Sequence, residues 1–126
     1  MLKILRMKTY NKLIRDKIPE VIADDNFIGR YKKLNKKEFK KALFEKIIEE
    51  TAELSKTSNK ADLIEELADL QEILLVLYEN EKISVKEIEA VRKAKLKKRG
   101  GFTKRIMLLD MTPNKNYRKN NGSKLI

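Results

Sequence analysis

Apolar side chains recur every three or four residues along two stretches in the middle of the chain. The first stretch begins near Lys36, and its apolar stripe consists of Phe39, Leu43, Ile47 and Leu54. The second runs from about Asp62 to Asn80, and its stripe consists of Leu63, Leu67, Leu70, Leu74 and Leu77. This spacing matches the turn of an α-helix, and the polar residues 56–61 interrupt it. The pattern therefore predicts two long helices joined by a short turn, an antiparallel helical hairpin.

Shorter elements are expected on both sides of this hairpin. Residues 10–25 indicate a basic loop followed by a short helix, because Pro19 suits an early helical turn, where its missing N–H costs little. Ser84 followed by Glu87 is a capping-box signature, which predicts a third helix after the hairpin. That helix should stop at Gly100 and Gly101, a typical C-terminal signal.

The fold class expected from this pattern is all-α, with a single domain over residues 10–110. Within it, FTKRIMLLD at residues 102–110 is compatible with a short strand or an extended segment. Residues 1–9 would form an N-terminal extension. Residues 111–126 are polar and are expected to form a disordered tail.

The residue composition removes several classes of function. The chain has no Cys and no His, which excludes disulfides, thiolate metal sites, ordinary zinc sites and His-dependent nucleophilic catalysis. The longest apolar run, ILLVLY at residues 73–78, is far shorter than the ~20 residues that span a bilayer. The first residues, MLKILRMK, lack the apolar core of a signal peptide. We therefore expect a cytoplasmic protein without a membrane partner.

The net charge of +11 is unevenly distributed along the chain. Residues 45–89 carry thirteen acidic and five basic side chains, whereas residues 1–44 and 90–126 are strongly basic. An acidic centre between two basic flanks is a poor match to a uniform nucleic-acid-binding surface. It fits a cation site surrounded by phosphate-binding groups.

Two pairs of carboxylates lie at equal distances from the break between the predicted long helices. Glu50 and Glu53 are three residues apart on the first helix, and Glu66 and Asp69 are three residues apart on the second. Each pair therefore projects from one helical face. In an antiparallel hairpin with axes ~8–10 Å apart, the two pairs face each other at the same level.

Two of these carboxylates also continue the apolar stripes. Glu50 lies between Ile47 and Leu54, and Asp69 is followed by apolar residues at helical spacing. Four converging, partly buried carboxylates cannot all stay ionised without a cation. Oxygen ligands select hard ions, so Mg²⁺ is the expected cofactor, with Mn²⁺ as a substitute.

Three segments resemble a known family. EETAE at Glu49–Glu53, followed by ELAD at Glu66–Asp69, resembles the signature of MazG-like all-α nucleoside triphosphate pyrophosphohydrolases. YNKLIRDKIPEVI at Tyr10–Ile22 and KLKKRGGFTKRIML at Lys95–Leu108 resemble the house-cleaning branch related to phosphoribosyl-ATP pyrophosphohydrolase. The resemblance extends over about residues 7–110.

The resemblance implies a helical-hairpin bundle that forms a homo-dimer or homo-tetramer. It also implies Mg²⁺-dependent cleavage of a nucleoside triphosphate, expected to be non-canonical, to a monophosphate and pyrophosphate. The Mg²⁺ ligands would be Glu50, Glu53, Glu66 and Asp69. Glu49, Glu50 and Glu53 would be catalytic, although Glu49 could instead support the ligands from behind or be an exposed neighbour.

Basic residues on both flanks are candidates for holding the substrate's phosphates. They are Lys12, Arg15, Lys17, Lys95, Lys98 and Arg99. Lys98 and Arg99 have a second explanation, because cations in the last turn of a helix are favoured by its dipole alone.

Other functions are compatible with the same sequence. The substrate could be phosphoribosyl-ATP, or the protein could be a metal-bound scaffold without activity. A third alternative is a basic helical module that binds nucleic acid or acts as an adaptor, which the basic ends of the chain support. Against nucleic acid as a partner, the acidic centre would repel a phosphate backbone unless it held a metal.

Overall fold

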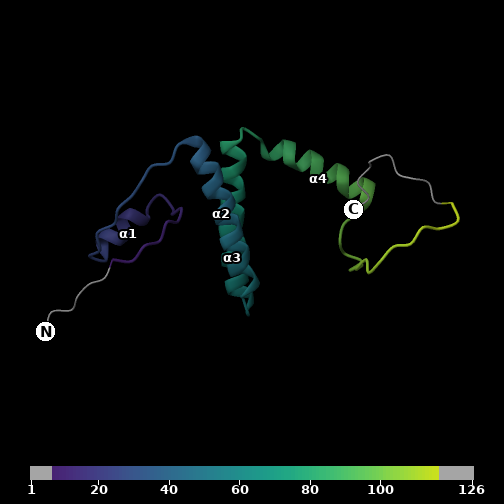
Figure 1. Cartoon of the computed structure of the whole chain (residues 1–126), viewed down its shortest axis with the longest axis horizontal. Coiled ribbons are helices and arrows are strands. Elements are labelled where there is room, and N and C mark those ends of the chain that lie inside the picture. Colours follow the sequence, from purple (N-terminus) through teal and green to yellow (C-terminus); the bar gives the residue numbers. More distant parts are fainter. Residues whose placement is uncertain (1–6, 117–126) are drawn as a thin grey trace. The chain divides into compact units, whose positions relative to one another are not determined.

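The computed structural model describes residues 7–116, which form four helices and no strand (Figure 1). The helices are α1 (Ile18–Asp24), α2 (Lys36–Ser55), α3 (Lys60–Asn80) and α4 (Val85–Arg99). The all-α fold class predicted from the sequence is therefore confirmed. Residues 102–110 contain a bend and a turn at 102–104 and no strand, so the short strand that was one of the two possibilities is absent there.

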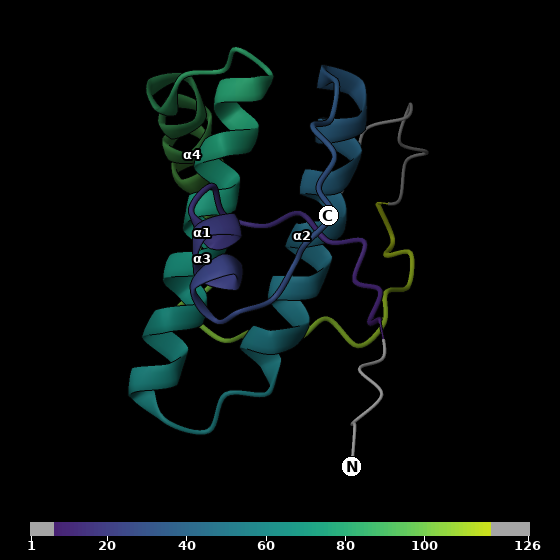
Figure 2. The ribbon, with the colours of Figure 1, turned by 90° about the vertical axis from the view of Figure 1, so that its left-hand side faces the viewer.

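Helices α2 and α3 lie side by side and antiparallel, which forms the predicted hairpin (Figure 1 and Figure 2). The connection between them is shorter than the sequence pattern indicated. The side chain of Asn59 accepts a hydrogen bond from the backbone N–H of Asp62, so α3 begins at Lys60, before the expected Asp62. Asn35 and Glu38 form a reciprocal capping box that fixes the start of α2.

The two signals predicted for the last helix are both present. The hydroxyl of Ser84 accepts a hydrogen bond from the backbone N–H of Glu87, whose carboxylate accepts one from the backbone N–H of Ser84. Helix α4 ends at Arg99, and Gly100 follows with φ at 79°, a left-handed conformation that glycine adopts without steric cost. α1 carries its proline in the first turn, as expected.

The chain divides into two compact units at a boundary between Ala90 and Val91, within α4. The first unit contains α1, α2, α3 and the beginning of α4, and the second contains the rest of α4 and the segment that follows. The expectation of a single domain over residues 10–110 stays a prediction. Most of the predicted extension (residues 1–6) and of the predicted tail (residues 117–126) lies outside the described residues.

Little of the described chain is fully buried. Leu43 on α2, at 1% exposure, is the single fully buried hydrophobic residue among residues 7–116. Large apolar side chains on both helices of the hairpin are exposed, among them Phe44, Ile48, Ile64 and Leu67. Among the described residues, no helix is both long enough and apolar enough to cross a membrane.

Candidate metal centre

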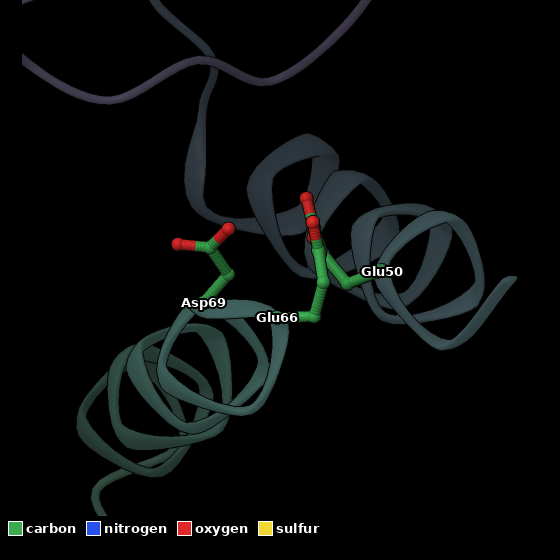
Figure 3. Close-up of side chains that lie close together, drawn as sticks. All are labelled: Glu50, Glu66 and Asp69. Atoms are coloured by element: carbon green, nitrogen blue, oxygen red, sulfur yellow. The ribbon is translucent and has the colours of Figure 1, made fainter. Parts of the chain in front are cut away.

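Three carboxylates from the two helices of the hairpin converge on one point. Glu50 extends from α2, and Glu66 and Asp69 extend from adjacent turns of α3 (Figure 3). One oxygen of each residue lies within 4.8 Å of the others. Antiparallel packing brings these positions together, because Glu50 is five residues before the end of α2 and Glu66 and Asp69 are six and nine residues after the start of α3. The predicted convergence is therefore present for three of the four proposed ligands.

Glu53, the fourth predicted ligand, lies outside this group of three. Its side chain is 51% exposed, and its Oε1 is 3.8 Å from Nζ of Lys56, which caps the C-terminal end of α2. Glu53 is nevertheless close enough that its negative charge acts on Glu66. Glu53 therefore lies at the edge of the cluster, and its carboxylate is turned toward Lys56.

Burial and the neighbouring carboxylates together raise the pKa of Glu66. Desolvation raises the pKa of Glu66 most, followed by the close approach of Glu50 and then by the charges of Asp69 and Glu53. Its Oε2 atom is buried and has no hydrogen-bond partner. A buried acceptor without a partner is costly, and a cation would satisfy it.

The donor set fits a hard divalent ion. The three converging side chains are all carboxylates, and Mg²⁺ and Mn²⁺ prefer oxygen ligands over nitrogen or sulfur. Glu50 is the least exposed carboxylate of the cluster, with 12% of its side chain accessible, whereas Asp69 is 40% exposed. The cluster is therefore most buried at Glu50 and more exposed to solvent at Asp69.

Glu49 points to basic residues and is not part of the three-carboxylate cluster. Its Oε1 accepts hydrogen bonds from Nζ of Lys12 at 3.0 Å and from Nζ of Lys46 at 3.3 Å. Desolvation alone would raise the pKa of Glu49, but the two lysine hydrogen bonds outweigh it and lower the pKa. The same contact raises the pKa of Lys12, so both groups stay charged at neutral pH.

Arg15 makes the second contact between the N-terminal segment and the hairpin. Its Nη2 donates a hydrogen bond to Oδ1 of Asp69 at 2.7 Å. Figure 2 shows the segment before α1 passing in front of both helices of the hairpin. Lys12 and Arg15, which the sequence suggested as phosphate-binding residues, thus lie beside the carboxylates and contact two of them.

The remaining predicted substrate-binding residues have exposed side chains. Lys17 is exposed at the N-cap of α1. Lys95, Lys98 and Arg99 are exposed on the part of α4 that belongs to the second compact unit. Their assignment to the substrate stays a prediction.

Lys46 was not singled out from the sequence, although a signal for it existed. Its Nζ is 3.3 Å from Glu49 and 3.6 Å from Glu50, at the three- and four-residue spacings that bring side chains together on a helix. Only 21% of its side chain is exposed. Lys46 therefore places a positive charge next to Glu50, the least exposed carboxylate of the cluster.

The amino-acid sequence matches one known protein family. The sequence model of the phosphoribosyl-ATP pyrophosphohydrolase family matches residues 7–95, about two thirds of the chain. This chain belongs to that family. The phosphoribosyl-ATP pyrophosphohydrolase family is part of the MazG-like all-α superfamily, so the resemblance drawn from the sequence is confirmed. No curated protein and no solved structure matches the chain.

Membership in the phosphoribosyl-ATP pyrophosphohydrolase family implies a pyrophosphohydrolase, a hydrolase that acts on phosphoric anhydrides. The matched range contains the whole carboxylate cluster, together with Lys12, Arg15 and Glu49. It ends at Lys95 and thus before Lys98 and Arg99.

Proposed function

We propose that this protein hydrolyses a nucleoside triphosphate between its α- and β-phosphates and releases a nucleoside monophosphate and pyrophosphate. The observation that supports this most strongly is the convergence of Glu50, Glu66 and Asp69 around the buried, unpartnered oxygen of Glu66. Such a group can hold a divalent cation, and the family match supplies the class of bond that is cleaved.

In this proposal, Glu50, Glu66 and Asp69 hold Mg²⁺ or Mn²⁺, and Glu53 joins them by turning its carboxylate away from Lys56. The bound metal would neutralise charge on the phosphoryl oxygens. Glu49 stays ionised beside Lys12 and Lys46, so it can accept a hydrogen bond from the attacking water. In this proposal, water adds to the α- or β-phosphorus and gives up a proton to Glu49, while the P–O bond to the bridging oxygen breaks, so that the products are nucleoside monophosphate and pyrophosphate.

Basic side chains would bind the charged part of the substrate. Lys12, Arg15 and Lys17 belong to the same compact unit as the cluster, and the first two already lie beside it. We include Lys95, Lys98 and Arg99 as further phosphate-binding residues. A phosphoryl-transfer transition state needs chiefly positioning and charge stabilisation, which these groups can provide.

The base and sugar of the substrate define two alternatives. A non-canonical nucleoside triphosphate is our first choice on the motifs of the sequence. Phosphoribosyl-ATP is the second, and the family match favours it specifically. Both substrates would lose pyrophosphate by the same chemistry at the same carboxylates.

We also propose that the functional form is a homo-dimer or homo-tetramer. The exposed apolar residues of the hairpin, including Phe44 and Ile48 on α2 and Ile64 and Leu67 on α3, are more than a stable monomer usually leaves in water. Packing of a second copy on this surface would complete the core that Leu43 begins.

The function is tested by pyrophosphate release from standard and damaged nucleoside triphosphates and from phosphoribosyl-ATP, with Mg²⁺ and with chelator. We expect metal-dependent release from at least one substrate. Glu50→Gln should lower turnover by at least ~100-fold, since even residues behind metal ligands cost about 10- to 100-fold. Glu65→Gln is the matched control, because Glu65 is exposed on the same hairpin and should retain turnover. Release that is unaffected by chelator would rule out the proposed centre.

A further inference from the structure

Two carboxylates of the candidate metal centre, and Glu53 beside it, are paired with cations of the chain itself. Asp69 contacts Arg15 at 2.7 Å, Glu50 contacts Lys46 at 3.6 Å, and Glu53 contacts Lys56 at 3.8 Å. The pairs differ in origin. Lys46 and Lys56 are three or four residues from their partners, whereas Arg15 is 54 residues from Asp69.

Arg15 is the cation that is best able to leave. It lies in a segment without regular secondary structure just before α1, and its side chain is 62% exposed. The backbone of α2 or its C-cap instead keeps Lys46 and Lys56 next to their partners. An exposed ion pair is weak, so a divalent ion can displace the guanidinium from Asp69 at small cost.

We propose that Arg15 occupies Asp69 before metal binds and is released by the metal to bind a phosphate of the substrate. The inference rests on the proposed function, because it takes Asp69 as a metal ligand. A divalent ion bound to Asp69 would lie close to the Arg15 guanidinium on the same carboxylate, and the two positive charges would repel each other. Once displaced, the planar guanidinium is suited to bidentate contact with phosphate oxygens. Metal binding thereby makes the phosphate-binding arginine available.

Lys12 has a different role on the same segment. Its partner Glu49 lies outside the three-carboxylate cluster and is also bound by Lys46, so a metal in the cluster does not compete with Lys12. The Lys12–Glu49 contact can therefore persist while Arg15 moves. It keeps the N-terminal segment next to the hairpin and limits the movement to the Arg15 side chain.

The test is calorimetric titration of the full chain with Mn²⁺ alone, comparing wild type, Arg15→Gln, Arg15→Lys and Lys17→Gln. Arg15→Gln should bind Mn²⁺ about two- to fivefold more tightly, the gain expected from removing an exposed ion pair. Arg15→Lys keeps a competing charge and should stay close to wild type. Lys17→Gln removes one charge from the same segment and should gain clearly less. Equal affinity in Arg15→Gln and wild type, or an equal gain in Lys17→Gln, overturns the proposal.

Pyrophosphate release supplies a second readout. Arg15→Gln should need less metal for half-maximal turnover and yet turn over more slowly, because the phosphate contact is lost. A purely structural role for Arg15 would weaken both properties together and would contradict the proposal. Tighter Mn²⁺ binding by Arg15→Gln, combined with a wild type that hydrolyses none of the substrates, would support the exchange at Asp69 and refute the proposed function. No Mn²⁺ binding by the wild type would overturn both.

Discussion

Glu66 is held in an environment that suits a metal ligand better than a free carboxylate. Its pKa is raised by desolvation first and then by Glu50, Asp69 and Glu53, and its Oε2 has no hydrogen-bond partner. Without a cation, the folded chain keeps like charges together that the unfolded chain separates. Ionised Glu66 therefore lowers the stability of the metal-free protein.

Replacing Glu66 with Gln should stabilise the metal-free protein at neutral pH. Because the folded-state pKa lies above the ordinary 4.5, ionisation of Glu66 costs the folded state more than the unfolded state. The cost is absent below the unfolded pKa and complete above the raised folded pKa. Urea unfolding in chelator should therefore show a gain in the free energy of unfolding for Glu66→Gln that grows as pH rises through this window.

The control for this prediction is Glu65→Gln, which removes the neighbouring carboxylate on the exposed side of α3. It should show no comparable gain. If Glu66→Gln is as stable as wild type at every pH, the carboxylates are farther apart in solution than in the structure. Added Mg²⁺ should stabilise the wild type and leave Glu66→Gln nearly unchanged, since the variant lacks a ligand.

The sequence predicted the convergence of three carboxylates better than the partners of the basic residues. The helical period and the position of the break were enough to bring together Glu50, Glu66 and Asp69, because both are local properties of the chain. The contacts of Lys12 and Arg15 span 37 and 54 residues and depend on the path of the N-terminal segment. Spacing along a helix carries no information about such a path.

Polar caps set the ends of the two hairpin helices and thereby the level of their carboxylates. Asn35 starts α2 with a capping box, and Asn59 starts α3 immediately after the connection. A cap satisfies backbone N–H groups that the helix cannot bond itself. Because Asn59 lies close to the carboxylates in sequence, its cap fixes where Glu66 and Asp69 stand relative to α2.

Asn35→Ala should destabilise the protein by ~1 kcal/mol, the usual cost of losing a side-chain N-cap. The substitution removes the 2.8 Å hydrogen bond from the backbone N–H of Glu38 to Oδ1 of Asn35. Urea unfolding at neutral pH would measure the loss, and Asn35→Asp should restore most of it because it keeps the acceptor. Activity per folded molecule should be unchanged in both variants. A stable Asn35→Ala protein would mean that the first turn of α2 contributes little to folding.

Among the described residues, most large hydrophobic side chains remain partly or fully exposed to solvent. Leu43 alone is fully buried among the described hydrophobic residues, while Phe44 and Ile48 on the same helix are 48% and 69% exposed. Lys37, Lys40, Lys41 and Glu45 surround these two side chains. An apolar centre with a charged rim is typical of a protein interface.

Ile48→Gln should weaken self-association if this surface joins two copies of the chain. Sedimentation velocity of the wild type should show a dimer or tetramer whose stability rises with protein concentration. The variant should shift toward the monomer and unfold at a lower temperature. Lys60→Gln, a change at an exposed position of the hairpin outside this patch, should behave like the wild type. A wild-type protein that is monomeric at all concentrations would contradict the proposed assembly.

The order of residues along the chain was sufficient to predict the all-α class, the hairpin and the convergence of Glu50, Glu66 and Asp69. Each of these follows from a period of apolar positions, a break and an equal distance from that break, which are local quantities. The tertiary structure decided that Glu53 turns to Lys56 at the edge of the cluster, that Glu49 lies between Lys12 and Lys46, and that Arg15 reaches Asp69. These outcomes depend on rotamers and on contacts between distant segments, whose energies are small individually and are set only when the chain has folded.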